Sequence, residues 1–395
     1  MRGAALADLH LGFRQFTHVS KGRNTREIDT EEAWFAAVKL IVENKPDLVT
    51  IAGDVFHHPR ASNFATRAFL TGVRNLIDDT DAEIVIAQGN HDAGRTAEVL
   101  TPIALAEVWN PDRVFIVTTP KRIRFTAGDP GWIGDLVPPS VSVAVFPFVV
   151  MGDGKSYKLD PDPEADVNVL LLHAAVRGSS EGDRLPYFYG SADQALDVGR
   201  EVDRWDVIAC GDFHKFTRLD PTNLAFYSGS LERTSSNIWD EHHPKGVVFY
   251  DTATREMELA PVPNRKMSDY DLGDFDHPPG VGAEKVNECL EALAGYPTLE
   301  DTIVRFKVDA FPRAEREHIN WALVRALKSY CTHFKLDIRY GKAEALDLGD
   351  RRNKKTLSLA DEWLAFSKDD PDDVRACAVH FLDLEAEVED AEVTP

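Results

Sequence analysis

The first half of the chain alternates between short apolar runs and segments with a helical spacing of apolar residues. Gly3–Asp8, Leu48–Asp54 and Glu83–Gln88 are β-rich runs. Thr30–Asn44 and Ala61–Leu76 lie between them and repeat their apolar residues every three or four positions. Alternation of strand, helix and strand is typical of βαβ units, so we expect a largely parallel sheet.

Further apolar runs follow, and several lie close enough along the chain to pair as hairpins. These runs are Val114–Val117, Arg122–Phe125, Val141–Phe146, Val167–Leu172, Val207–Cys210, Leu224–Tyr227 and Gly246–Tyr250. They predict a second sheet packed on the first, so the expected fold class is an α/β sandwich.

The pattern changes near Pro261–Asn264. Beyond it the chain is expected to form a helix, a strand, a second helix and a second strand, over Ala283–Ala294, Thr302–Val308, Arg313–Cys331 and Phe334–Tyr340. A basic linker, Gly349–Lys355, precedes two expected tail helices, Ser358–Phe366 and Asp372–Glu389. We therefore expect three parts, over residues 1–263, 264–342 and 343–395.

The composition is that of a globular protein, with 43% apolar and 9% aromatic residues. The four cysteines form no CxxC pair, which argues against a disulfide framework and against a thiolate zinc site. The beginning of the chain lacks the apolar core of a signal peptide, and its apolar stretches are too short to cross a bilayer. We expect a cytoplasmic protein, of a bacterium or of the host if the chain is viral, that does not enter a membrane.

The net charge of −22 is unusual for a protein that binds nucleic acid. Residues 361–395 hold 12 acidic and two basic residues and contribute −10, which leaves −12 for residues 1–360. A basic field over the whole molecule is therefore absent, and any contact with DNA must use local basic patches and bound cations.

Five short motifs follow apolar strands at their predicted carboxyl ends, where open α/β sheets place their ligand sites. They are Asp8-Leu-His10, Gly53-Asp54, Gly89-Asn90-His91-Asp92, His173 and Gly211-Asp212-Phe213-His214. Divalent cations such as Mn²⁺ accept mixed sets of carboxylate, amide and imidazole ligands, and two ions about 3.5–4 Å apart can hold a phosphate for in-line displacement. Each motif alone fits an ordinary turn or a core histidine, but their joint occurrence in order indicates a two-metal site.

These segments resemble the calcineurin-like metallophosphoesterases, and among them the SbcD-type repair nucleases. LADLHLG, IAGDVFHHPRAS, AQGNHD, VLLLHAAV, GDFHKF and YSGSLERTS match the family's motifs in order. The resemblance implies two mixed β-sheets flanked by helices over residues 1–263, a small α+β capping domain over 264–342, and a helical tail that binds an ATPase partner over 343–395.

The resemblance also implies the role of each residue. One metal ion would be held by Asp8, His10, Asp54 and His214, and the second by Asp54, Asn90, His173 and Asp212. His91 would act on the phosphate as a catalytic residue, since an imidazole titrates near neutral pH, and Asp92 would orient it. His57 matches a family position near the nucleic acid.

Asp212 departs from the family pattern, which is usually GHxH where this chain has GDFH. A third carboxylate adds negative charge, so we expect a weaker pull on the phosphodiester and a preference for Mn²⁺ or Mg²⁺ over Zn²⁺. The alternative is that Asp212 replaces the histidine with little effect.

Phosphate contacts require Lys or Arg near the metal ions. Arg14, Arg60 and Arg95 follow three of the motifs and are expected to contact nucleic acid, although a loop arginine is often only solvated surface. Few aromatic residues interleave them, so we expect binding to duplex ends and single strands without sequence preference.

Apolar stripes on the two tail helices fit either packing onto the capping domain or docking onto a partner. The resemblance favours docking onto an SbcC-like ATPase, and it implies a homodimer.

The sequence thus predicts a Mn²⁺-dependent exonuclease and endonuclease that acts on DNA ends, with Mg²⁺ as the alternative metal. Two other functions stay open: a phosphatase or phosphodiesterase of the same superfamily, and a non-catalytic DNA-end clamp that serves as a scaffold for the ATPase.

Overall fold

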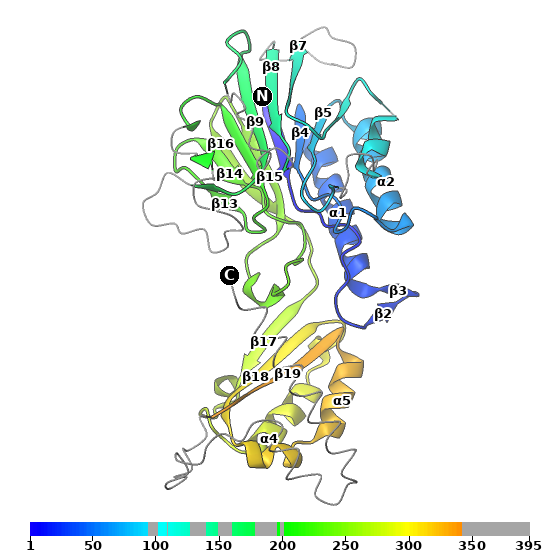
Figure 1. Cartoon of the computed structure of the whole chain (residues 1–395). Helices are drawn as coiled ribbons and strands as arrows, with labels where there is room; N and C mark the ends of the chain where they lie inside the picture. Colours follow the sequence, from blue (N-terminus) through cyan, green and yellow to red (C-terminus); the bar gives the residue numbers. More distant parts are fainter. Residues whose placement is uncertain are drawn as a thin grey trace, which may run out of the picture.

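Two six-stranded sheets stack on each other in the larger part of the molecule (Figure 1). The computed structural model describes residues 1–93, 102–108, 110–126, 140–148, 160–177, 196–197 and 201–341. The predicted tail helices and Arg95 lie outside these residues.

The first sheet is mixed and contains the strands of the βαβ units. Its order is β16 (Glu256–Pro261), β15 (Gly246–Asp251), β1 (Arg2–Leu6), β4 (Leu48–Ala52), β5 (Glu83–Ala87) and β6 (Val114–Val117). β1, β4, β5 and β6 run parallel, and β15 runs antiparallel to both of its neighbours. β16 was not predicted, because its polar residues interrupt the apolar pattern.

The second sheet is also mixed, with antiparallel strands at its edges. Its order is β13 (Thr217–Arg218), β14 (Leu224–Tyr227), β12 (Val207–Gly211), β9 (Val167–His173), β8 (Ser140–Phe146) and β7 (Lys121–Thr126). The four inner strands are parallel. The predicted sandwich of two mixed sheets is therefore confirmed.

Alternate residues of the first sheet pack in opposite directions, as the period of a strand requires. Leu6, Ile51 and Ile86 pack toward the helices α1 (Thr25–Asn44) and α2 (Asn63–Asp79) and the 3₁₀ helix η1 (Pro102–Val108). The opposite face carries Ala5 and Ala52, which pack against the second sheet. These small side chains lie near the carboxyl ends of their strands, where they let the two sheets approach closely.

Helix α1 begins five residues before the predicted start at Thr30. Asn24 caps it by accepting a hydrogen bond from the backbone N–H of Arg26. The first turn is buried but polar, with Arg26, Glu27 and Asp29 among its residues. A search for apolar spacing does not detect such a turn.

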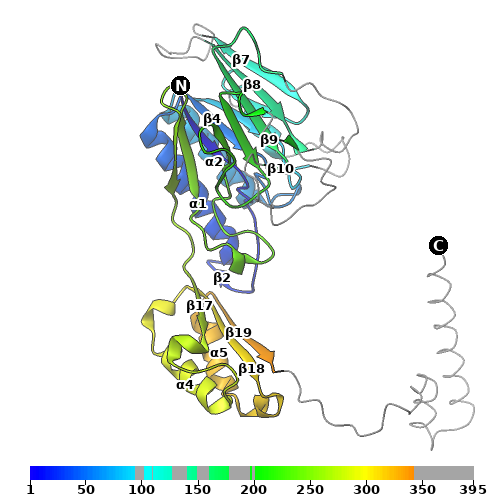
Figure 2. The same cartoon turned by 90° about the vertical axis from the view of Figure 1, so that its left-hand side faces the viewer.

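A smaller unit contains a parallel three-stranded sheet of β17 (Met267–Asp271), β18 (Ile303–Phe311) and β19 (His333–Tyr340). Helices α4 (Ala283–Ala294) and α5 (Trp321–Tyr330) pack on one face of it (Figures 1 and 2). The predicted helix Arg313–Cys331 is wrong in its first half: η7 (Arg313–His318) is a separate 3₁₀ helix, and Asn320 caps α5. β17 was not predicted.

The remaining elements are short. They are β2 (Val19–Ser20), β3 (Arg23–Asn24), β10 (Val176–Arg177), β11 (Leu196–Asp197), η4 (Ile238–Asp240), η5 (Leu272–Phe275) and η6 (Pro297–Leu299).

Contacts between the two units include an ion pair, an aromatic stack and the packing of Trp239 against Ile303 and Arg305. Arg265 Nη2 lies 2.6 Å from Asp29 Oδ1 of α1. The ring of Phe16 stacks on His333 of β19, with 3.6 Å between the ring centroids. In the described part of the chain no helix has the length and apolar character needed to cross a bilayer.

Candidate metal centre

Residues from both large sheets meet at the carboxyl ends of their parallel strands. Asp8 and His10 follow β1, Asp54 follows β4, and Asn90 follows β5. His173 ends β9, and Asp212 and His214 follow β12. These are the residues that were predicted as metal ligands, and the structure brings them together.

Asp8, His10 and His214 form the first cluster. One ligand atom from each of these residues lies within 4.8 Å of the others. His10 Nε2 lies 3.0 Å from His214 Nε2 and 3.7 Å from Asp54 Oδ2. Two ring nitrogens that face each other at this distance suit a shared cation.

A second cluster contains Asp8, Asp54 and His173, again with ligand atoms within 4.8 Å. His173 Nε2 lies 2.9 Å from Asn90 Oδ1 and 3.9 Å from Asp212 Oδ1. His173 Nδ1 lies 2.7 Å from the carbonyl oxygen of Ala52. A carbonyl only accepts, so Nδ1 carries a proton and donates to Ala52, and Nε2 faces the cluster.

Burial perturbs the acids and bases of both clusters. Burial first, and then the neighbouring carboxylates, raises the pKa of Asp8 to about 6, although nearby histidines oppose this. Burial opposes the charged form of His173, yet Asp54, Asp8 and Asp212 raise its pKa to about 9. Burial, and then the charge of His214, holds the pKa of His10 well below its usual value.

The carboxylates of the site lack ordinary cationic partners. Among the described residues, no Lys or Arg forms an ion pair with Asp8, Asp54 or Asp212. Asp8 and Asp54 are at most 3% exposed. Buried carboxylates of this kind require a compensating cation.

Four candidate ligands adopt left-handed backbone conformations. The φ angles are 51° at Asp8, 44° at His10, 52° at Asp54 and 96° at Asp212. Such conformations are uncommon outside glycine, and they concentrate at functional sites.

Two glycines allow the ligand loops to approach each other. A Cβ on Gly89 would lie 2.1 Å from Asp54 Oδ1, and one on Gly53 would lie 2.3 Å from His173 Nδ1. Only glycine fits these two positions.

His91 lies beside the clusters and is oriented by the backbone. Its Nδ1 lies 2.8 Å from the carbonyl oxygen of His57, so Nδ1 donates and Nε2 is left for another partner. The ring of His91 lies edge-on to that of His10, with 4.9 Å between centroids, and stacks on His57 at 5.2 Å. Burial, and then the charge of His91, lowers the pKa of His57 to about 4.

Asp92 has a different place from the one predicted. Its buried carboxylate accepts hydrogen bonds from the backbone N–H groups of Val55, Phe56 and Gly89, at 3.1, 2.9 and 3.0 Å. It therefore joins the loops after β4 and β5, whereas the carbonyl of His57 orients the ring of His91.

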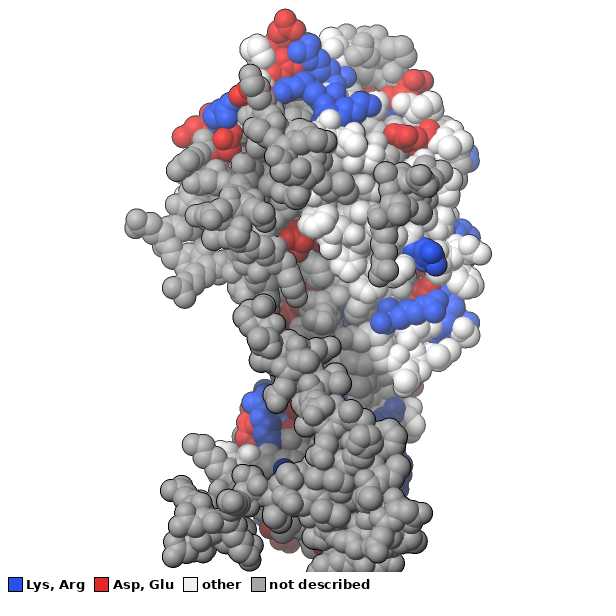
Figure 3. Space-filling model, in the orientation of Figure 1, with Lys and Arg blue, Asp and Glu red and all other residues white. Residues whose placement is uncertain are grey.

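The predicted arginines that the structure describes lie at the surface. Arg14 Nη2 pairs with Glu27 at 3.0 Å, and the Arg14 side chain is 61% exposed. Arg60 is exposed as well. On the face in Figure 3, Lys and Arg gather in separate groups, with no continuous basic surface in the part that is coloured.

Sequence reasoning missed three residues around the site. The Phe148 ring, 41% exposed, lies edge-on to His173 with 6.1 Å between centroids. Glu241 and Lys245 lie behind His214. Phe148 lies just beyond strand β8, Glu241 follows YSGSLERTS by six residues, and Lys245 directly precedes β15, so their places next to a motif or a strand were the available signal.

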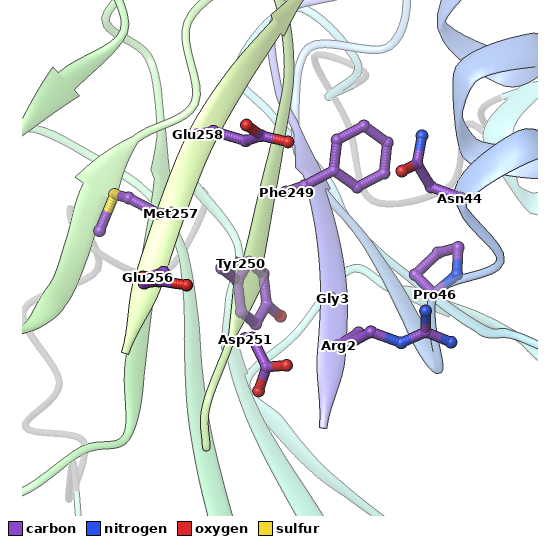
Figure 4. A pocket seen from close by; sticks show the side chains of 10 residues that line it. All are labelled: Arg2, Gly3, Asn44, Pro46, Phe249, Tyr250, Asp251, Glu256, Met257 and Glu258. Carbon is purple, nitrogen blue, oxygen red and sulfur yellow. The ribbon is translucent and has the colours of Figure 1, made fainter. Parts of the chain in front are cut away.

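A cavity of about 540 Å³ lies away from the candidate metal ligands. It opens where β1 begins, the end opposite Asp8, and none of the candidate ligands lines it (Figure 4). Its lining residues are Arg2, Gly3, Asn44, Pro46, Phe249, Tyr250, Asp251, Glu256, Met257 and Glu258. The convergence of the ligands, rather than the size of a cavity, therefore identifies the candidate site.

Comparison with known proteins gives a family match over the same region. The model of the calcineurin-like phosphoesterase family matches residues 1–216, more than half of the chain. A crystal structure of TT1561 from Thermus thermophilus covers 66% of this chain and 99% of its own at 13% identity, with a TM-score of 0.37 that is too low for any conclusion.

Three curated proteins named DNA double-strand break repair protein Mre11 are similar to the chain. The protein of Methanopyrus kandleri is 32% identical over 185 residues, which is 45% of this chain and 39% of that protein. The Methanococcus maripaludis protein is 30% identical over 260 residues, 63% of this chain and 62% of its own. The Methanocaldococcus jannaschii protein is 32% identical over 273 residues, which is 65% of this chain and 64% of that protein. The matches thus span less than two thirds of each relative.

Proposed function

This chain belongs to the calcineurin-like phosphoesterases, and we propose that it is a metal-dependent nuclease that hydrolyses phosphodiester bonds at DNA ends. The observation that carries the proposal is the convergence of Asp8, Asp54 and His173 from three strands of two sheets. The similar proteins named for DNA double-strand break repair support DNA as the substrate.

The donor set fits divalent cations. Buried carboxylates without Lys or Arg partners in the described residues stand beside ring nitrogens and an amide oxygen, a mixture that suits Mn²⁺. One ion would be held by Asp8, His10, Asp54 and His214, and the other by Asp54, Asn90, His173 and Asp212. We propose Mn²⁺ for both, with Mg²⁺ as the alternative. When bound, such ions neutralise phosphate charge and make water more acidic.

The chain's own residues then orient the substrate and move a proton. His91, with Nδ1 held by the His57 carbonyl, presents Nε2 toward the clusters. In its protonated form it would stabilise the attacked phosphate and donate a proton to the leaving oxygen as the P–O bond breaks. Asp92 supports this by holding together the two loops that carry Asp54 and His91.

Further parts of the proposal concern binding. Arg14, Arg60 and Arg95 would contact the phosphates of duplex ends and single strands, with His57 near the nucleic acid. Residues 1–263 would form the nuclease domain and residues 264–342 the capping domain. The tail over 343–395 would dock onto an SbcC-like ATPase, and the nuclease would be a homodimer.

The deciding experiment is digestion of end-labelled duplex DNA and of circular single-stranded DNA in the presence of Mn²⁺. We expect exonuclease cleavage of the end-labelled duplex and endonuclease cleavage of the circle, and His91→Asn should remove both activities while Mn²⁺ still binds. Faster turnover of nitrophenyl phosphate esters than of DNA would instead indicate a phosphatase or phosphodiesterase. DNA binding without cleavage would indicate an end clamp.

A further inference from the structure

A buried lysine lies directly behind His214. The side chain of Lys245 is 0% exposed. Its ammonium donates to the carbonyl oxygen of His214 at 2.9 Å, to Ser230 Oγ at 2.7 Å and to Glu241 Oε2. An ammonium has three donors, and here each has a partner.

Glu241 lies between this lysine and the imidazole of His214, whose Nδ1 also lies 3.4 Å from Thr234 Oγ1. Its side chain is 6% exposed, and Oε1 lies 3.9 Å from His214 Nδ1. Oε1 also accepts a hydrogen bond from the backbone N–H of Ser235 at 2.8 Å, which fixes the carboxylate. Glu241 thus faces the nitrogen of His214 that points away from the first cluster.

The backbone of His214 is held at the same time. Its carbonyl oxygen accepts from Lys245 Nζ, from the backbone N–H of Ser230 at 3.1 Å and from His243 Nε2 at 3.0 Å. The other ring nitrogen, Nε2, lies 3.0 Å from His10 Nε2 in the first cluster.

We propose that Lys245 and Glu241 are positioning residues for His214, which together fix its backbone and its ring so that Nε2 is presented to a divalent cation. The inference rests on the proposed function. A carboxylate beside Nδ1 favours the tautomer with the proton on Nδ1, which leaves the lone pair on Nε2. Lys245 neutralises the buried charge of Glu241 and ties the carboxylate to the His214 carbonyl. A lysine suits this place because its three donors diverge from one atom, unlike the planar fork of arginine.

The test measures metal binding and the state of the His214 ring in the full chain. Glu241→Gln keeps the shape and removes the charge, and Lys245→Met keeps the volume and removes the donors. We expect two Mn²⁺ ions per wild-type chain in calorimetric titration. Each variant should bind one of them about tenfold more weakly and the other unchanged. Lys285→Met removes an exposed lysine of α4 and serves as the control.

A second readout needs no metal. Long-range ¹H–¹⁵N spectra of the histidines, recorded with a chelator at a pH where the rings are neutral, report which nitrogen carries the proton. Wild type should show His214 protonated on Nδ1, and Glu241→Gln should shift the proton toward Nε2. The signal that is lost in His214→Gln is the signal of His214. A residue with a merely structural role would not change the tautomer.

Lys245→Met leaves Glu241 buried without its partner and can fail to fold. The double variant Lys245→Met/Glu241→Gln removes both buried charges, so it avoids the unpaired carboxylate. Mn²⁺ affinity and the His214 tautomer are then measured in this variant. Unchanged affinity for both ions and an unchanged tautomer in the folded variants would overturn the positioning role alone. If the wild type binds no Mn²⁺, the proposed function fails instead.

Discussion

Strained backbone at the candidate ligands is the main feature at the scale of single residues. Asp8, His10 and Asp54 have φ angles between 44° and 52°. Each such residue costs about 1–3 kcal/mol, so the surrounding structure must hold it in place. The hydrogen bonds from the N–H of Asp8 to Gly53 and from the N–H of His10 to Asp54, at 3.0 and 2.9 Å, join the two loops and fix these conformations.

The first prediction concerns Gly89→Ala. Its Cβ would lie 2.1 Å from Asp54 Oδ1 and 2.2 Å from Asp54 N, so the loops after β4 and β5 must separate. We expect at least about tenfold weaker Mn²⁺ binding by calorimetry, because a shared ligand moves. Gly295 directly follows α4, and its φ of −79° is open to any residue. Gly295→Ala is therefore the matched control and should bind Mn²⁺ like wild type. Equal binding by both variants would contradict the close-approach argument.

The second prediction concerns Asp212, whose side chain is 39% exposed with Oδ1 3.9 Å from His173 Nε2. Asp212→His removes one of three carboxylates and adds a softer ligand. We expect a shift in preference from Mn²⁺ toward Zn²⁺ of about tenfold in competition titrations, together with a changed nuclease rate. Asp212→Asn separates the loss of charge from the gain of an imidazole. An identical stoichiometry and rate in Asp212→His would favour simple replacement.

At the scale of elements, the polar first turn of α1 joins several parts of the molecule. Glu27 accepts from Arg14 Nε at 3.2 Å and from Ser62 Oγ, the cap of α2, at 2.7 Å. Arg26 pairs with Asp29 and lies 3.4 Å from Glu232, and Asp29 pairs with Arg265 of the segment before β17. Burial of a charged network is tolerated because its members pair with one another.

The third prediction concerns the stack of Phe16 on His333 between the two units. Burial, and then Lys328 and Lys335, lowers the pKa of His333 from 6.5 to about 4. Between pH 4 and pH 6.5 the His333 side chain binds more protons in the unfolded chain than in the folded one. The contribution of the neutral His333 to the free energy of unfolding is therefore complete above pH 6.5 and is lost as the pH falls toward 4. His333→Phe keeps an aromatic stack and removes the titration.

Urea unfolding at about pH 7.5 and about pH 5 tests this. The free energy of unfolding should fall less on acidification in His333→Phe than in wild type. His318→Phe, which changes a histidine that is 68% exposed, is the control. An equal fall in wild type and His333→Phe would show that His333 does not contribute.

At the scale of the whole molecule, the centre depends on two sheets that meet at their carboxyl ends. The backbone N–H of Asp212 donates a hydrogen bond to Asp8 Oδ1 at 3.2 Å, although the two residues are 204 positions apart in the chain. Alanines on the facing surfaces of both sheets, among them Ala5, Ala52 and Ala209, permit this approach. The smaller unit is attached through contacts that include Arg265, the Phe16–His333 stack and the packing of Trp239 against Ile303, outside the candidate ligand clusters.

The fourth prediction concerns the tail. Because the ligands lie between Asp8 and His214, deleting residues 356–395 should leave Mn²⁺ binding and cleavage of naked DNA unchanged. The same deletion should abolish co-purification with an SbcC-like ATPase, which is the proposed partner. Unchanged co-purification would refute the proposed role of the tail, and a loss of Mn²⁺ binding would show that the tail supports the metal centre.

Local pattern and residue type were sufficient to predict the two sheets and the candidate ligands. A strand repeats every two residues, so apolar runs locate β1, β4, β5, β9 and β12, and a polar residue directly after such a run lies at the strand's carboxyl end. Asp8, Asp54 and His173 were therefore found from the sequence. Elements with polar residues on a buried face, such as the first turn of α1, were missed because their partners are distant in the chain.

Only the tertiary structure decided how these residues act together. The orientation of His91 by the His57 carbonyl, the bonds of Asp92 to two loops, and the support of His214 by Lys245 and Glu241 join residues far beyond one helical turn or one strand pair. Sequence by itself determined which donors stand at the ends of the strands, because short-range periodicity encodes that. The packing of two sheets determined which donors lie close enough to share a cation, because such distances depend on contacts between segments as far apart as Asp8 and His214.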